Sequence, residues 1–114
     1  MRDSVLVVGS GMMGSGIGAM AALAGRKVIL LDVDRERAER GRQKAVACIR
    51  IRGENGLNTE EEVSRAPGLI DCSDNLEEAC GRAFLVIEAI VENVEAKQEL
   101  FAELDGRLPV DVPV

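Results

Sequence analysis

The 114-residue chain contains no histidine, tryptophan or tyrosine, and only two phenylalanines. Without histidine it has no imidazole to serve as a general base near neutral pH, and none of its acids is a convincing substitute. With so few aromatic rings, it offers no platform on which nucleic-acid bases could stack. These absences argue against a complete acid–base catalytic site and against nucleic acid as a partner.

Cysteine is also scarce. Cys48, Cys72 and Cys80 have no C-x-x-C spacing and leave one unpaired, so the sequence indicates neither a disulfide framework nor a metal site. We therefore expect a reducing, cytoplasmic setting. No apolar run approaches the roughly twenty residues of a membrane-spanning helix, and nothing resembles a secretion signal. The net charge of −6 would repel both nucleic acid and anionic membrane surfaces.

A glycine-rich pattern near the start of the chain is its most informative feature. An apolar run over Val5–Val8 opens into the spacing G-x-G-x-x-G at Gly9, Gly11 and Gly14. This pattern predicts a strand, a tight turn and a helix whose N-terminal N–H groups face a dinucleotide pyrophosphate. Gly9 would allow the turn, Gly11 the close approach of phosphate, and Gly14 the close packing of helix on strand.

An acid follows a second apolar run at Asp32. At the carboxyl end of the second strand, such an acid accepts hydrogen bonds from the adenosine ribose. It would also repel the 2′-phosphate of NADP, and Asp34 adds to that repulsion, so the sequence predicts NAD. Arg35 is the one nearby cation that argues otherwise. The alternative is a glycine-rich turn that serves only helix packing.

The remainder of the chain alternates helix and strand patterns. Strands are predicted over residues 27–31, 69–72 and 84–90, and the last is expected to be buried. Helices are predicted after the glycine loop as far as Gly25, from Asp34 to about Arg52, from a T-x-x-E capping box at Thr59, from Asp74 to Gly81, and from Asn93 to Pro109. We expect Met12, Met13 and Met20 to lie in the core. The alternation predicts an α/β fold with a doubly wound parallel (Rossmann) sheet, truncated before its second half is complete, within one domain over residues 1–114.

Two stretches go beyond the general dinucleotide pattern. One is VGSGMMGSGI over residues 8–17, and the other is LVIEAIVENVEAKQELF over residues 85–101. Both resemble the NAD-binding domain of the 3-hydroxyacyl-CoA dehydrogenase family, and ordinary Rossmann domains do not share the second. The resemblance implies a set of cofactor contacts from Gly9, Gly11, Met12, Met13, Gly14, Asp32, Ala89, Ile90, Glu92 and Lys97. From composition alone, Glu92 and Lys97 would be an ordinary surface ion pair.

The resemblance also implies a function. The chain would be the N-terminal NAD-binding part of an NAD-dependent enzyme that oxidises the 3-hydroxyl of an acyl-CoA by hydride transfer to NAD. The family's catalytic histidine and glutamate, and the domain that completes the substrate pocket and the homodimer, would lie outside this chain. We therefore expect no catalytic residue here and no activity from this chain alone.

One departure from the family leaves the substrate open. Where family members contact CoA through a serine and a lysine, this chain has Cys48, with only Arg50 or Arg52 as nearby cations. A related dehydrogenase of a non-CoA hydroxy acid, of the carnitine or gulonate type, is therefore an alternative. A non-catalytic NAD-binding module and a structural fragment that has lost cofactor binding are two others.

Overall fold

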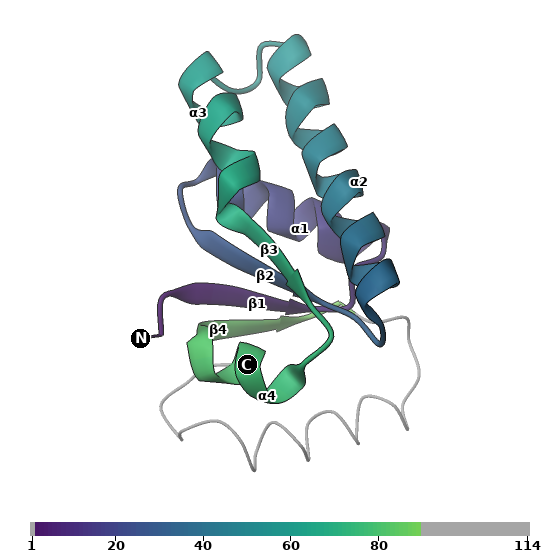
Figure 1. Ribbon diagram of the computed structural model, residues 1–114. Helices are drawn as coiled ribbons and strands as arrows, with labels where there is room; N and C mark the ends of the chain where they lie inside the picture. Colours follow the sequence, from purple (N-terminus) through teal and green to yellow (C-terminus); the bar gives the residue numbers. More distant parts are fainter. Residues whose placement is uncertain (1, 90–114) are drawn as a thin grey trace.

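A parallel sheet forms the centre of the computed structural model, which describes residues 2–89. Its strands are β1 (Ser4–Val8), β2 (Lys27–Leu31), β3 (Ile70–Ser73) and β4 (Ala83–Glu88). They lie side by side in the order β3-β2-β1-β4, all parallel (Figure 1). The helix predicted from Asn93 lies outside the described residues.

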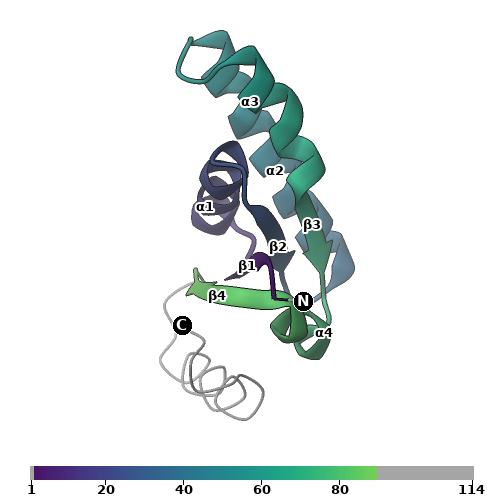
Figure 2. The same cartoon turned by 90° about the vertical axis from the view of Figure 1, so that its left-hand side faces the viewer.

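Helices cover both faces of the sheet. They are α1 (Met12–Leu23), α2 (Arg35–Glu54), α3 (Glu60–Arg65), the 3₁₀ turn η1 (Ala66–Leu69) and α4 (Leu76–Arg82). Helices α1 and α2 pack on one face and α4 on the other (Figure 2). The predicted doubly wound parallel fold is thus confirmed. Within residues 2–89, no helix has both the length and the apolar character that a membrane crossing requires.

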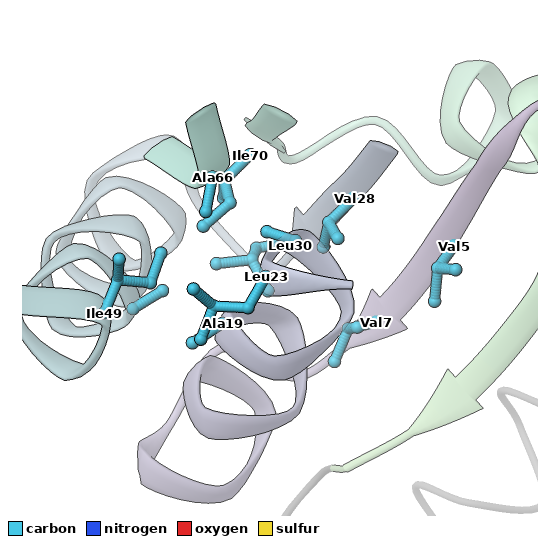
Figure 3. Packing of buried hydrophobic residues seen from close by; sticks show 11 residues of the cluster. Val5, Val7, Ala19, Leu23, Val28, Leu30, Ile49, Ala66 and Ile70 are labelled. Carbon is cyan, nitrogen blue, oxygen red and sulfur yellow. The ribbon is translucent and has the colours of Figure 1, made fainter. Parts of the chain in front are cut away.

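The core follows from the alternation of side chains along the two central strands. Val5 and Val7 of β1 point toward α1 and α2, together with Leu30 of β2 (Figure 3). Leu6 and Val8 point the other way and pack against α4. Because both faces are covered, each central strand is apolar over nearly its whole length.

Helices α2 and α3 begin where the sequence predicted them, and α3 has the predicted capping box. Asp34 caps α2 by accepting a hydrogen bond from the N–H of Arg37 at 2.7 Å. At α3, Thr59 and Glu62 form both bonds of the predicted capping box. These signals involve residues three positions apart, so they can be recognised in the sequence without knowledge of the tertiary structure.

The prediction that the methionines of α1 lie in the core was wrong. Met12 is 88% exposed, Met13 70% and Met20 48%. The buried face of α1 instead carries small residues with a single leucine: Gly14, Ser15, Gly18, Ala19, Ala22 and Leu23. The reason is close packing, since a Cβ added at Gly18 would lie only 2.9 Å from Leu30 Cδ2.

Strand β4 is less buried than predicted. Phe84, Leu85 and Ile87 are each partly exposed, although Ala83 and Val86 are buried. Within residues 2–89, β4 pairs with β1 and with no second strand. One side of β4 is therefore uncovered by the described part of the fold.

Candidate functional site

The carboxyl ends of the strands bring the predicted site residues to one edge of the sheet. The glycine loop follows β1, Asp32 follows β2 and Ala89 follows β4 (Figure 1). Strand order reverses at β1, with β2 on one side and β4 on the other. Ligands of open α/β sheets bind at such a reversal, outside the carboxyl ends.

The glycine loop has the tight geometry that its spacing predicts. Gly9 has φ +98°, in the left-handed region that glycine tolerates, and its N–H donates to the Leu31 carbonyl at 2.8 Å. A Cβ at Gly14 would collide with the carbonyl oxygen of Gly9. A Cβ at Gly11, by contrast, would meet nothing within 4 Å. The loop is therefore packed beneath Gly14 and open beside Gly11.

The N-terminus of α1 is left open by its own sequence. Its N-cap is Gly11, which has no side chain to accept from the first N–H groups, and its first turn carries no acid. Met12 and Met13 form this first turn, so their backbone N–H groups lie at the open end. Free N–H groups and the positive end of the helix dipole suit a phosphate group.

Asp32 is half-buried and held by three hydrogen bonds. Its Oδ2 accepts from the N–H of Ser10 at 3.0 Å and from Ser10 Oγ at 2.6 Å. Its Oδ1 accepts from the N–H of Val33 at 2.7 Å. Burial alone raises the pKa of Asp32, but the bonds from Ser10 and Val33 outweigh it and hold the pKa below its usual value. The carboxylate is thus charged at neutral pH.

Ala89 is the last described residue of the predicted set. Its N–H donates to the carbonyl of Val8 at 2.8 Å, which ties the end of β4 to the start of the glycine loop. The structure therefore brings the glycine loop, Asp32 and Ala89 to one edge of the sheet. Ile90, Glu92 and Lys97 lie outside the described residues.

Sequence reasoning missed two residues that shape this edge. Ser10 is 3% exposed and contacts Asp32. On α2, a Cβ at Gly41 would collide with Ser10 Cβ, so this glycine permits the helix to approach the loop. Gly41 did carry a signal, because a glycine inside a helix costs about 1 kcal/mol relative to alanine and usually has a packing reason. Ser10 carried none, since it occupies a variable position of the glycine pattern.

A cavity of about 540 Å³ lies beside the open helix end. Its wall is mostly apolar, with two cations, and is formed by Met12, Ser15, Gly16, Lys44, Ala47, Cys48, Ile51 and Arg52. Cys48 and Arg52 are among the residues at which the sequence departs from the family's CoA contacts. Within residues 2–89, no group of three acids or cysteines is placed to hold a metal ion.

Comparison with known proteins agrees with this geometry. The family described as "3-hydroxyacyl-CoA dehydrogenase, NAD binding domain" matches residues 4–112. The chain is 44% identical over 105 residues to a probable 3-hydroxybutyryl-CoA dehydrogenase of Bacillus subtilis, covering 92% of this chain and 36% of that protein. A 3-hydroxybutyryl-CoA dehydrogenase of Mycobacterium tuberculosis is 40% identical over 99 residues, with 87% and 34% covered.

Solved structures give the same result. The crystal structure of 3-hydroxybutyryl-CoA dehydrogenase from Escherichia coli has a TM-score of 0.86 at 33% identity, covering 98% of this chain and 24% of that one. The enzyme from Ralstonia eutropha has a TM-score of 0.85 at 25% identity, with 98% and 39% covered. The chain thus spans about a third of the length of the curated relatives it matches.

The predicted resemblance is confirmed, because the match covers nearly all of the chain and the glycine loop has the expected form. The cofactor to which this family points is NAD. The chain belongs to the family of 3-hydroxyacyl-CoA dehydrogenase NAD-binding domains.

Proposed function

We propose that this chain holds the adenosine and pyrophosphate of NAD, as part of an NAD-dependent 3-hydroxyacyl-CoA dehydrogenase. The observation that carries the proposal is the meeting of an open loop at Gly11, an uncapped α1 and a charged Asp32 at one edge of the sheet. The first two suit the pyrophosphate and the third suits the adenosine ribose, and all three lie where strand order reverses.

Different residues contact different parts of the ligand. Around Gly9, Gly11 and Gly14, the loop lets the pyrophosphate approach the backbone, and the N–H groups of Met12 and Met13 at the start of α1 donate to it. Asp32 accepts from a ribose hydroxyl through Oδ1, which among residues 2–89 receives only the bond from Val33.

The remaining contacts belong to the other half of the ligand. The backbone of Ala89 and Ile90 would contribute there, Glu92 would accept a ribose hydroxyl, and Lys97 would pair with Glu92 or approach the nicotinamide. The family match over residues 4–112 supports these four assignments. When bound, NAD accepts the hydride. This chain contributes binding and orientation to that step and no catalytic residue.

The cavity beside α1 supports an acyl-CoA substrate. Its cations, Lys44 and Arg52, suit the phosphates of CoA, and its apolar wall suits the pantetheine chain. The named relatives are 3-hydroxybutyryl-CoA dehydrogenases. In the whole protein, a further domain would complete the site and form a homodimer.

A cytoplasmic setting without nucleic-acid or membrane partners forms part of the same proposal. The net charge of −6 supports it, since such a chain would be repelled by nucleic acid and by anionic membranes. The three cysteines, Cys48, Cys72 and Cys80, form no disulfide with one another, which suits a reducing compartment.

Calorimetric titration of the chain with NAD, ADP-ribose and NADP tests the binding proposal. We expect NAD and ADP-ribose to bind with similar affinity, because the adenosine half carries the contacts. NADP should bind at least tenfold more weakly, since its 2′-phosphate faces Asp32. Asp32→Ala should lose this preference. Equal affinity for NAD and NADP in the unmodified chain would overturn the assignment of Asp32.

A turnover assay tests the proposal that this chain binds the cofactor but carries no catalytic residue. With NADH and acetoacetyl-CoA, the chain alone should show no oxidation of NADH, because it has no histidine to exchange the alcohol proton. Steady turnover by the purified chain would contradict the claim that it carries no catalytic residue.

A further inference from the structure

Ser10 is a buried residue of the glycine loop. Its side chain contacts Asp32 of the proposed cofactor site, but the proposed function gives Ser10 itself no contact with the cofactor. It is 3% exposed, and its Oγ lies 2.6 Å from Asp32 Oδ2 and 3.0 Å from the carbonyl oxygen of Arg37. Its N–H donates to the same Oδ2 at 3.0 Å. One residue of the loop therefore places two donors on one carboxylate oxygen.

These bonds determine how Asp32 faces a ligand. A carboxylate oxygen has two good acceptor positions, and both on Oδ2 are filled by Ser10. On Oδ1 the N–H of Val33 fills one position, and the described part of the chain leaves the other open. Since both oxygens are held, the carboxylate cannot rotate freely. It offers a ribose a single acceptor position rather than a two-pronged one.

The surrounding structure holds Ser10 in turn. Ser15 Oγ donates to the Ser10 carbonyl at 2.9 Å. Helix α2 closes the other side at Gly41, where an added Cβ would lie 2.6 Å from the Ser10 carbonyl oxygen and 2.8 Å from its Oγ. The loop, α1 and α2 thus meet at this one side chain.

We propose that Ser10 is a positioning residue, which orients the Asp32 carboxylate so that it accepts one hydroxyl of the adenosine ribose. Gly41 supports it by letting α2 approach the loop. The inference rests on the proposed function, because it takes Asp32 as the ribose acceptor.

The test compares NAD with its analogues that lack the 2′- or the 3′-hydroxyl of the adenosine ribose, by titration calorimetry on the chain. In the unmodified chain, loss of one of these hydroxyls should weaken binding about tenfold or more, because it removes a hydrogen bond to a charged group. Loss of the other should cost less than about threefold. Comparable losses for both would overturn the single-acceptor geometry.

Ser10→Ala then isolates the role of the hydroxyl. The ratio of affinities for NAD and the more sensitive analogue should fall from about tenfold to about threefold or less, since Asp32 loses the bond from Ser10 Oγ and Oδ2 regains an open acceptor position. Ser10→Gly should give the same result and serves where the alanine variant does not fold. The matched control is Ser4→Ala, which removes a buried hydroxyl at the opposite end of β1, where it donates to Asp3. It should keep the full ratio.

The outcomes separate the two proposals. If the unmodified chain fails to bind NAD, or binds both analogues as tightly, the proposed function fails. If it discriminates and Ser10→Ala keeps the same ratio while binding all ligands more weakly, Ser10 is structural only and the inference fails.

Discussion

Helices α1 and α2 begin at the same edge of the sheet but begin in different ways (Figure 1). Helix α2 is closed by Asp34, whose side chain accepts from Arg37, and Glu36 lies in its first turn. Helix α1 starts at Gly11, with no capping side chain and no acid. Unsatisfied N–H groups at a helix start cost stability unless something accepts from them. Helix α1 is thus left without a cap at the place where we propose that the pyrophosphate binds, whereas α2 is capped by its own side chain.

The largest expected effect comes from a substitution that forces α1 away from strand β1. Gly14→Ala should destabilise the fold by about 3 kcal/mol or more, because the new Cβ collides with the backbone of Gly9. Chemical denaturation measures the change. The control is Gly16→Ala, which has open space at its Cβ and should stabilise the helix by about 0.5 to 1 kcal/mol. Equal stability of the two variants would contradict the close packing at Gly14.

Adding a capping side chain at the start of α1 should strongly weaken NAD binding without destabilising the fold. Gly11→Asp places a capping carboxylate at an extended position with open space around it, so the unliganded chain should gain up to about 1 kcal/mol. Affinity for NAD should fall about a hundredfold, because the new charge lies where the pyrophosphate would bind. Gly11→Ala separates charge from bulk. If the aspartate variant binds NAD as tightly as the alanine variant, the phosphate does not lie at this helix end.

Removing the cap of α2 should have the smallest effect. It should lower the stability of the fold and leave the affinity for NAD nearly unchanged. Asp34→Ala removes the cap and should cost about 1 kcal/mol of stability. Affinity for NAD should change by less than about threefold, since α2 does not face the ligand with its N-terminus. Thermal unfolding and calorimetry on the same sample give both values. A loss of NAD affinity as large as that of Gly11→Asp would remove the distinction between the two helix starts.

The same two helices show which parts of the structure could be predicted from the sequence. For α2 the start and the approximate end were predicted, because each depends on residues a few positions apart. For α1 the glycine pattern was interpreted correctly, but the buried face was not. Apolarity favoured the methionines for the core, whereas Gly18 and Leu30 show that the helix lies too close to the sheet to admit them.

In the candidate site, too, some residues could be predicted from the sequence and others could not. The glycine spacing and Asp32 were visible in the sequence, because the first strand, the loop and the second strand form one continuous unit of about thirty residues. Ser10 and Gly41 were not, since their importance comes from a contact between segments separated by thirty-one positions. Such a contact exists only once α2 has packed beside the loop.

By itself, the sequence determined the alternation of strands and helices, the capping box at Thr59, the glycine loop and the acid that follows the second strand. All of these follow from backbone conformation and hydrogen bonding between near neighbours. Only the tertiary structure decided which side of α1 is buried and how the Asp32 carboxylate is oriented. These depend on the distance between packed elements, where the presence or absence of one Cβ decides the outcome, and a linear pattern does not encode that distance.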